Sequence, residues 1–298
     1  MANAQNPTFL VTGAGGQLGR RVVQLLAEAK PGKLIAATRN PGKLADLARQ
    51  GIEVRKADFD DPASLSAAFQ GVDRLLLVST DDLATPGKRL AQHRAAVAAA
   101  EKAGIKHVVY TSAPAPHPTA ASSLIDDHFW TEQALIGSTP DWTILRDNLY
   151  TDLLLMGLPH AVATGQLFTA AGTGGRNYVT REDCARTAAA ALVSANGKQI
   201  LDVNGPAPVT QDEIAAIASE VTGKKVTHIP VSPDDLRKGL AGAGLPPFLI
   251  EALVAFDMDA ARGYHAVNAT TVKDLTGREP VSVRSFLAEH RAALLGGH

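Results

Sequence analysis

The sequence predicts an α/β protein with a doubly wound parallel sheet and a smaller C-terminal α/β lobe. Short β-rich runs alternate with helical stretches through the first half of the chain, as they do when helices cover both faces of a parallel sheet. Each run precedes a stretch long enough for a crossover helix, and crossovers of this kind are right-handed. The predicted strands are residues 8–12, 34–39, 52–56, 74–79, 106–112 and 142–146.

The helices and the second half of the chain follow from turn signals. An Ala-rich helix is predicted over 84–103, closed by Gly104, and a second over 123–136. Beyond residue 147 the pattern loosens, with GTGG at 172–175 and GLPPF at 244–248. We therefore expect one domain over 1–147 and a smaller lobe over 148–298. Residues 199–203 form a further strand that fits either the main sheet or the lobe, and we expect about 180–205 to return to the first domain.

Two local patterns in the lobe predict helix ends. Thr210 and Glu213 form a capping box for a helix that Gly223 closes. Thr180 is expected to be the N-cap of the helix that follows it.

Composition excludes several classes of function. The 298 residues carry 29 Lys and Arg against 30 Asp and Glu, so no broad positive face is available for nucleic acid. The one cysteine, Cys184, forms no internal disulfide and cannot build a zinc cluster. Neither a leader pattern nor an apolar run near the roughly 20 residues of a membrane span is visible. We expect a cytoplasmic protein without membrane insertion, direct nucleic-acid contact or a metal site.

A glycine-rich turn is the strongest functional signal. The segment FLVTGAGGQLG places Gly13, Gly16 and Gly19 after an apolar strand and at the start of a helix. The first glycine allows the tight turn, the second lets the backbone approach a pyrophosphate, and the third permits close packing of helix on sheet. The amides of Gln17 and Leu18 then face the phosphates at the helix N-terminus. This pattern predicts a dinucleotide site on a Rossmann domain.

The end of the second strand predicts NADPH rather than NADH. An NAD-binding enzyme places an acidic residue there, about 20 residues after the glycine turn. This sequence has Thr38 and Arg39 instead, and Lys43 follows one helical turn later. Two cations are thus available for a 2′-phosphate.

The ends of the next strands supply the remaining cofactor residues. Asp58 and Phe59 are expected to flank the adenine, and Ser79 and Thr80 to lie near the nicotinamide ribose. Thr111, at the end of the fifth strand, completes the predicted cofactor set.

A series of motifs resembles the NmrA-like branch of the atypical short-chain dehydrogenases, most closely its NAD(P)H:quinone oxidoreductase and triphenylmethane reductase group. The motifs are VTGAGGQLG, ATRNPGK, QHRAAVAAAEKAGIKHVVYTS, DDHFWTEQAL, ILRDNLYTD and AAGTGGRNYVTREDCA. The resemblance covers nearly the whole chain. It implies a reductase that uses NADPH to reduce a small aromatic acceptor such as a quinone or a dye, or a relative that senses NADP(H) without turnover.

The resemblance also locates candidate catalytic residues. The parent superfamily uses a serine and a Tyr-x-x-x-Lys pair to protonate a carbonyl. Ser112 stands at the serine position, whereas His128 replaces the tyrosine and Glu132 the lysine. A carboxylate cannot lower a tyrosine pKa as an ammonium does, so the usual alcohol dehydrogenase mechanism is disfavoured. His128 is either a proton donor at the pocket rim or a structural histidine.

The missing pair favours particular acceptors. Hydride addition to a ketone makes a strongly basic alkoxide, whereas addition to a quinone makes a phenolate whose acid has a pKa of about 10. A triarylmethane cation needs no proton at all. Reduction of an aromatic enone is a third possibility, but the lysine of the isoflavone-reductase relatives is not visible in DDHFWTEQAL.

Candidate acceptor residues follow the fifth and sixth strands. Relatives carry asparagine where Asp147 stands, so this carboxylate is a candidate catalytic residue that would repel an anionic acceptor. Asn148 and Tyr150 come next, and Tyr150 is placed to stack on a flat ring or to pack in the core. His117, in the stiff PAPHP loop, and Trp130 complete the candidate pocket. The sequence permits a monomer or a homodimer, because its long helices could pack on the sheet or between subunits.

Overall fold

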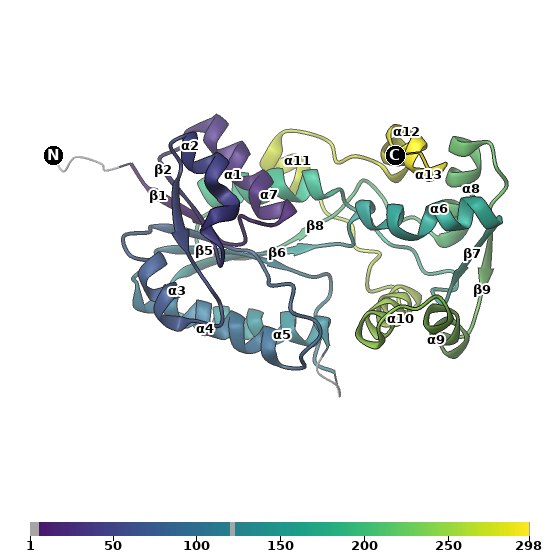
Figure 1. Ribbon diagram of the computed structural model, residues 1–298, viewed down its shortest axis with the longest axis horizontal. Coiled ribbons are helices and arrows are strands. Elements are labelled where there is room, and N and C mark those ends of the chain that lie inside the picture. The colour runs from purple at the N-terminus through teal and green to yellow at the C-terminus, as the bar shows by residue number, and fades with distance from the viewer. Residues whose placement is uncertain (1–5, 120–122, 298) are drawn as a thin grey trace. The chain divides into compact units, whose positions relative to one another are not determined.

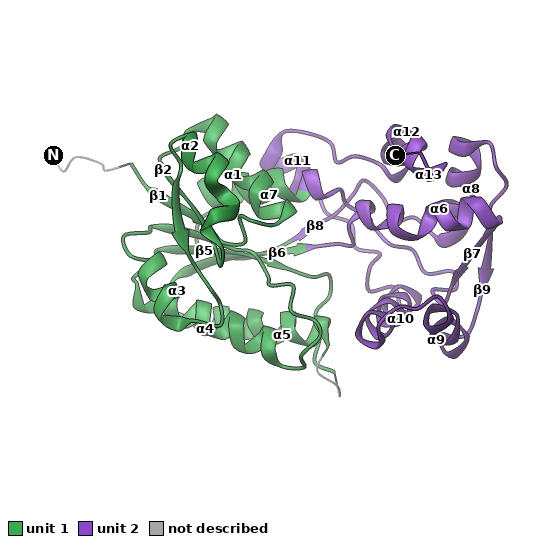
Figure 2. Cartoon of the chain, viewed as in Figure 1, with its two compact units in different colours: residues 1–146, 184–201 green, residues 147–183, 202–298 purple. Residues whose placement is uncertain are grey.

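The computed structural model describes residues 6–119 and 123–297, which fall into two compact units. Unit 1 comprises residues 1–146 and 184–201, and unit 2 comprises residues 147–183 and 202–298 (Figure 2). The chain therefore leaves unit 1 after Arg146, returns for the segment 184–201, and ends in unit 2.

A seven-stranded sheet forms the centre of unit 1 in the described part of the chain. Its order is β3-β2-β1-β4-β5-β6-β8, and the successive pairs from β3 to β6 are parallel. The strand order reverses between β1 and β4. Doubly wound sheets bind their ligands at this reversal, which is called the switch point. The strands are β1 (Thr8–Val11), β2 (Lys33–Thr38), β3 (Glu53–Lys56), β4 (Arg74–Leu77), β5 (His107–Ser112), β6 (Asp141–Asp147) and β8 (Lys198–Val203).

Helices cover both faces of this sheet, which confirms the predicted fold class. Figure 1 shows α1, α2 and α7 on one face and α3, α4 and α5 on the other. The helical elements are α1 (Gln17–Ala29), η1 (Pro41–Leu44), α2 (Ala45–Arg49), α3 (Pro62–Ala68), α4 (Lys88–Lys102), α5 (Leu124–Ile136) and α7 (Arg181–Ser194). The central strands are largely buried, with Leu75, Leu76 and Leu77 fully buried, because a parallel sheet is covered on both faces.

Segment 184–201 is bonded to the sheet through one arginine and one strand. The guanidinium of Arg74, at the start of β4, donates to the carbonyls of Leu192 and Ala195 at the end of α7. Residues 198–203 form β8, which joins the main sheet next to β6. The strand expected over 199–203 therefore belongs to the main sheet.

Two predicted boundaries in unit 1 were wrong. The strand expected over 74–79 ends at Leu77, because the next two amides bind hydroxyls: Val78 N donates to Thr12 Oγ1 and Ser79 N to Thr111 Oγ1. The helix expected from residue 84 begins at Lys88, because Gly87 has a φ of +74°, outside the helical region. Gly104 follows the helix with a φ of +70°.

Unit 2 contains a two-stranded parallel sheet and most of the remaining helices. Strand β7 (Gln166–Thr169) pairs with β9 (Thr227–Pro230). Its core has two parts, one contributed by α6, α8, α12 and α13 and one by α9 and α10. Thr210 and Glu213 form the expected capping box of α8, and Gly223 closes it. The helical elements are η2 (Thr151–Leu153), α6 (Leu154–Thr164), α8 (Gln211–Thr222), α9 (Pro233–Gly242), α10 (Pro247–Ala261), α11 (Thr271–Thr276), α12 (Val283–Glu289) and α13 (Arg291–Leu294).

Candidate functional site

The glycine turn connects β1 to α1 beside the β4 loop. Gly13 has a φ of +62°, and a Cβ there would lie 3.2 Å from the Cβ of Val78. A Cβ on Gly19 would lie 2.5 Å from the carbonyl oxygen of Gly13, closer than real contacts allow. The turn is closed by a hydrogen bond from Gly16 N to Gly13 O of 2.9 Å. Gly13 and Gly19 therefore let α1 begin directly against the end of β1.

The N-terminus of α1 is open to a ligand. Its N-cap is Gly16, which offers no side chain to the amides of the first turn, and Gln17–Arg20 contain no acidic residue. A Cβ built on Gly16 would lie 3.4 Å from Gly13 O, which is an ordinary contact distance. Unbonded amides and the helix dipole together favour an anion at such a terminus.

Two exposed cations lie beside the turn. Arg39 directly follows β2, and Lys43 lies in η1. Thr38 connects this strand end to the turn, because its Oγ1 is 3.0 Å from a Cβ built on Gly15. Arg20 of α1 fixes η1 by donating to the carbonyl of Lys43 at 2.9 Å. The guanidinium of Arg39 lies 3.8 Å from the exposed carboxylate of Asp81.

The β3 and β4 loops hold the other predicted cofactor residues. Asp58 accepts the amide of Asp60 at 3.1 Å, and Phe59 packs against the core. Ser79 N donates to Thr111 Oγ1 at 2.9 Å, so the ends of β4 and β5 are joined at the carboxyl edge of the sheet.

Helix α4 binds the β4 loop through Thr80. The Thr80 amide donates to His93 Nε2 at 3.0 Å, its carbonyl accepts from Arg89 Nε at 2.7 Å, and its hydroxyl donates to Gln92 Oε1 at 2.8 Å. Lys88 adds ion pairs of 3.1 Å to Asp60 and 2.7 Å to Asp82. Sequence reasoning assigned no role to these α4 side chains. The motif QHR was visible, but its spacing alone does not reveal partners on a loop.

His128 lies inside the protein rather than at a pocket rim. It is 4 % exposed, Arg89 Nη2 donates to its Nε2 at 2.9 Å, and its Nδ1 lies 2.8 Å from the hydroxyl of Tyr110. Burial, followed by the nearby Arg89 cation, holds the pKa of His128 well below its usual value. Both ring nitrogens of His128 therefore have partners inside the protein.

Ser112 of β5, Glu132 of α5 and Arg146 of β6 form a second hydrogen-bonded group. Ser112 Oγ donates to Glu132 Oε1 at 2.6 Å. Arg146 donates two hydrogen bonds to the same carboxylate, from Nε at 3.0 Å and from Nη2 at 2.7 Å. Glu132 is 1 % exposed and Ser112 is 5 % exposed. The hydroxyl proton of Ser112 is thus directed to a carboxylate that a bidentate arginine holds in place.

The segment after Arg146 belongs to unit 2. The Tyr150 hydroxyl donates to Asp147 Oδ2 at 3.5 Å, and the guanidinium of Arg181 lies over the Tyr150 ring, 5.0 Å from its centroid. The Asn148 amide nitrogen donates to Asn204 Oδ1 and to His265 O, each at 3.0 Å, and its oxygen accepts from Leu149 N. Asn148 therefore anchors this segment within unit 2.

Trp130 and His117 are the two remaining candidate acceptor residues. Trp130 is 38 % exposed, whereas His128 and Glu132, two residues to either side, face the interior. A separation of two residues places Trp130 on the opposite side of the helix. His117 turns back so that its Nδ1 lies 3.0 Å from the carbonyl of Ala115, whose φ is +42°.

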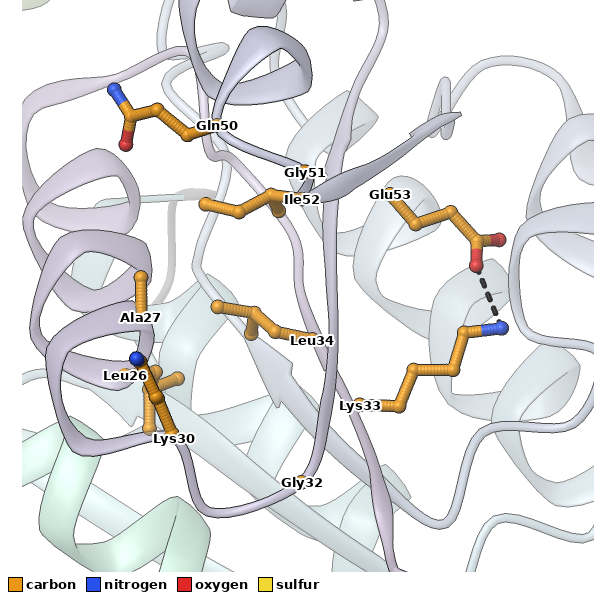
Figure 3. Close-up of a pocket in the computed structure, with 10 residues that line it drawn as sticks. All are labelled: Leu26, Ala27, Lys30, Gly32, Lys33, Leu34, Gln50, Gly51, Ile52 and Glu53. Atoms are coloured by element: carbon orange, nitrogen blue, oxygen red, sulfur yellow. Dashed lines mark ion pairs between the residues drawn. The ribbon is translucent and has the colours of Figure 1, made fainter.

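A pocket of about 380 Å³ lies at the other edge of the sheet (Figure 3). It is lined by the end of α1 and the amino ends of β2 and β3, with Lys33 and Glu53 paired at 2.7 Å on one side. The glycine turn follows the carboxyl end of β1, so this pocket does not belong to the site described above.

The fold and the glycine turn define a dinucleotide-binding protein. The chain belongs to the NAD(P)H-binding family, whose model matches residues 13–195.

Two of its relatives are named as reductases of quinones or azo compounds. Quinone oxidoreductase 2 of Escherichia coli (strain K12) is 37 % identical over 270 residues, covering 90 % of this chain and 93 % of the relative. An NAD(P)H azoreductase of Xenophilus azovorans is 29 % identical, covering 96 % and 98 %. These relatives support an NAD(P)H-dependent oxidoreductase.

Solved structures agree with this assignment. A triphenylmethane reductase of Citrobacter sp., complexed with NADP(H), superposes with a TM-score of 0.86 at 34 % identity, covering 95 % of this chain and 99 % of that chain. An NADPH-dependent quinone oxidoreductase of Escherichia coli, complexed with NADPH, gives a TM-score of 0.88 with the same identity and coverage. The resemblance expected from the sequence motifs is confirmed.

Within residues 6–119 and 123–297, no helix is long and apolar enough to cross a membrane. Over the same ranges, no group of three His, Cys, Asp or Glu side chains is arranged to hold a metal ion.

We expect acid to destabilise this protein from just below neutral pH. Burial lowers the pKa of His93 and His128 well below 6.5 and that of His107 to about 4. Below pH 6.5 these histidines bind protons in the unfolded chain but not in the folded chain. Each histidine therefore lowers the folding equilibrium constant up to about tenfold for each unit by which the pH falls.

Urea unfolding between pH 7.5 and pH 4.5 measures this effect. The free energy of unfolding should be level above pH 6.5 and fall below it, and H107Q should reduce the slope by nearly one proton. A flat profile down to pH 5, or an unchanged slope in H107Q, would contradict the assignment of neutral buried histidines.

Proposed function

We propose that this protein transfers hydride from NADPH to a quinone-like or cationic aromatic acceptor without a dedicated acid. The observation that carries the proposal is the Ser112–Glu132–Arg146 group, together with the open α1 terminus at the β1/β4 switch point. The cofactor, when bound, supplies the hydride.

The residues present fit a phosphorylated dinucleotide. The open side of Gly16 and the amides of Gln17 and Leu18 suit the pyrophosphate. Arg39 and Lys43 suit the 2′-phosphate, and an acidic residue for a ribose hydroxyl is missing from this strand end. The NADP(H) complexes of the two structural neighbours support the same choice.

The Ser112–Glu132–Arg146 group favours acceptors that need no protein acid. Because Ser112 donates its only hydroxyl proton to Glu132, it can accept a hydrogen bond from a ligand but has no proton left to donate. His128 is engaged at both ring nitrogens. A quinone suits such a site because the phenolate formed can take its proton from water, and a triarylmethane cation needs none.

Asp147, the last residue of β6, and Tyr150 are the proposed acceptor residues. The ring of Tyr150 is fixed by Arg181 on one face and by Asp147 at its hydroxyl, which suits a rigid stacking surface. A carboxylate at 147 disfavours anionic acceptors. The contacts of Asn148, His117 and Trp130 give these three residues less support as acceptor residues.

Anaerobic oxidation of NADPH, followed at its nicotinamide absorbance, tests the acceptor class. Benzoquinones, naphthoquinones and a triarylmethane dye should be reduced at least about 100-fold faster than simple ketones, because a ketone needs the acid that this site lacks. Faster reduction of ketones would refute the proposal. Tight NADPH binding without turnover of any acceptor would favour an NADP(H) sensor instead.

Substitution of Ser112 tests the missing acid. S112A should lower kcat for a quinone less than about fivefold, because loss of a true acid typically costs a hundredfold or more. A hundredfold loss, with NADPH affinity and thermal stability unchanged, would show that Ser112 does act as an acid.

Two glycine substitutions separate phosphate binding from packing. G16A should weaken NADPH binding at least about tenfold with little change in Tm, because its Cβ would meet Gly13 O at an ordinary contact distance of 3.4 Å but take up room beside the phosphate-binding amides. G19A should lower Tm as well, because its Cβ meets the Gly13 carbonyl. Titration of NADPH and thermal unfolding measure both quantities, and tight NADPH binding by G16A would contradict this location of the pyrophosphate.

A further inference from the structure

We propose that His93 of α4 is a positioning residue for the cofactor, acting by holding the backbone of Thr80 against the switch point. The inference rests on the proposed NADPH site and assigns a role to a side chain of α4.

The β4 loop forms one wall of the crevice where the strand order reverses. Gly13 of the opposing turn approaches Val78 so closely that a Cβ would lie 3.2 Å from the Val78 Cβ. Thr12 Oγ1 accepts Val78 N at 2.9 Å, and Thr111 Oγ1 accepts Ser79 N at the same distance. Ligands of doubly wound sheets bind in this crevice, so a shift of the loop moves the wall that faces them.

Thr80 depends on α4 for its position. Its amide, carbonyl and hydroxyl all bind α4 side chains, and the partner of the amide is His93 Nε2. An amide can only donate, so Nε2 must accept, and the ring proton of the neutral imidazole lies on Nδ1. Nδ1 then donates to Thr131 Oγ1 at 3.0 Å.

Thr131 connects His93 to the rest of the buried network. Its hydroxyl donates to the Asp127 carbonyl at 2.6 Å, which leaves its oxygen to accept from His93. His93 is fully buried, and Tyr110 OH lies 3.4 Å from its Nδ1. The imidazole is therefore fixed in orientation and tautomer, and it bridges α5 to Thr80.

Two amide substitutions separate the two sides of the ring. The oxygen of a glutamine reaches the position of Nε2, so H93Q can still accept from Thr80 N. The shorter side chain of H93N reaches only the position of Nδ1, so it keeps the contact with Thr131 and leaves the Thr80 amide without an acceptor.

The matched control is His107, at the amino end of β5. Its Nε2 lies 3.0 Å from Thr143 Oγ1, and the residue is 3 % exposed. H107N therefore breaks a buried histidine–threonine contact in the same unit, at the edge of the sheet away from the glycine turn.

Two measurements test the inference. In NADPH titrations, H93N should raise Kd about tenfold, H93Q less than about threefold, and H107N should leave Kd unchanged even where it lowers Tm as much as H93N. In hydrogen exchange of the cofactor-free protein, the Thr80 amide should exchange faster in H93N but not in H93Q or H107N.

Each remaining outcome overturns a stated idea. Three results would refute the positioning role. They are an unchanged Kd for NADPH in H93N, an equal increase of this Kd in H93N and H93Q, and an increase in H107N as large as that in H93N. If wild-type protein fails to bind NADPH but the exchange pattern holds, the proposed function falls while His93 still holds the loop. If the exchange pattern is absent, the inference falls whether or not NADPH binds.

Discussion

The close approach of α1 to the end of β1 is the constraint on which the site depends. A Cβ on Gly19 would lie 2.5 Å from the carbonyl oxygen of Gly13, so this helix can start where it does only with glycine at position 19. The approach aims the uncapped amides of α1 at the β1/β4 switch point. It also places the turn beside Val78 and Thr38, which brings the ends of β4 and β2 to the same place.

The surrounding side chains convert that edge into a selective site. Exposed cations follow β2, while the β4 loop is fixed by hydroxyls of Thr12 and Thr111 and by polar side chains of α4. The carboxylate of Glu132 on α5 accepts the hydroxyl proton of Ser112 in a hydrogen bond. In the proposed mechanism, backbone amides, the helix dipole and cations hold the dinucleotide, and water donates the proton to the product. This division explains why acceptors with stabilised products suit the proposed site.

Local signals in the sequence predicted the sheet, the glycine turn, the capping box of α8 and the strand ends to within two residues. They failed where distant partners decide. Val78 and Ser79 follow Leu77 without a turn signal, yet their amides bind hydroxyls of Thr12 and Thr111, far away in the chain, and the strand ends. The position of His128 in the family motif does not reveal that Arg89 and Tyr110, 39 and 18 residues away, bind its ring nitrogens. No spacing within α4 reveals that His93 binds the Thr80 amide.

A crystal structure of the protein with NADPH tests the central claim most directly. The account predicts the pyrophosphate within hydrogen-bonding distance of the amides of Gln17 and Leu18, with the 2′-phosphate beside Arg39. NADPH bound elsewhere on the protein, or with its phosphates away from the glycine turn, would contradict it.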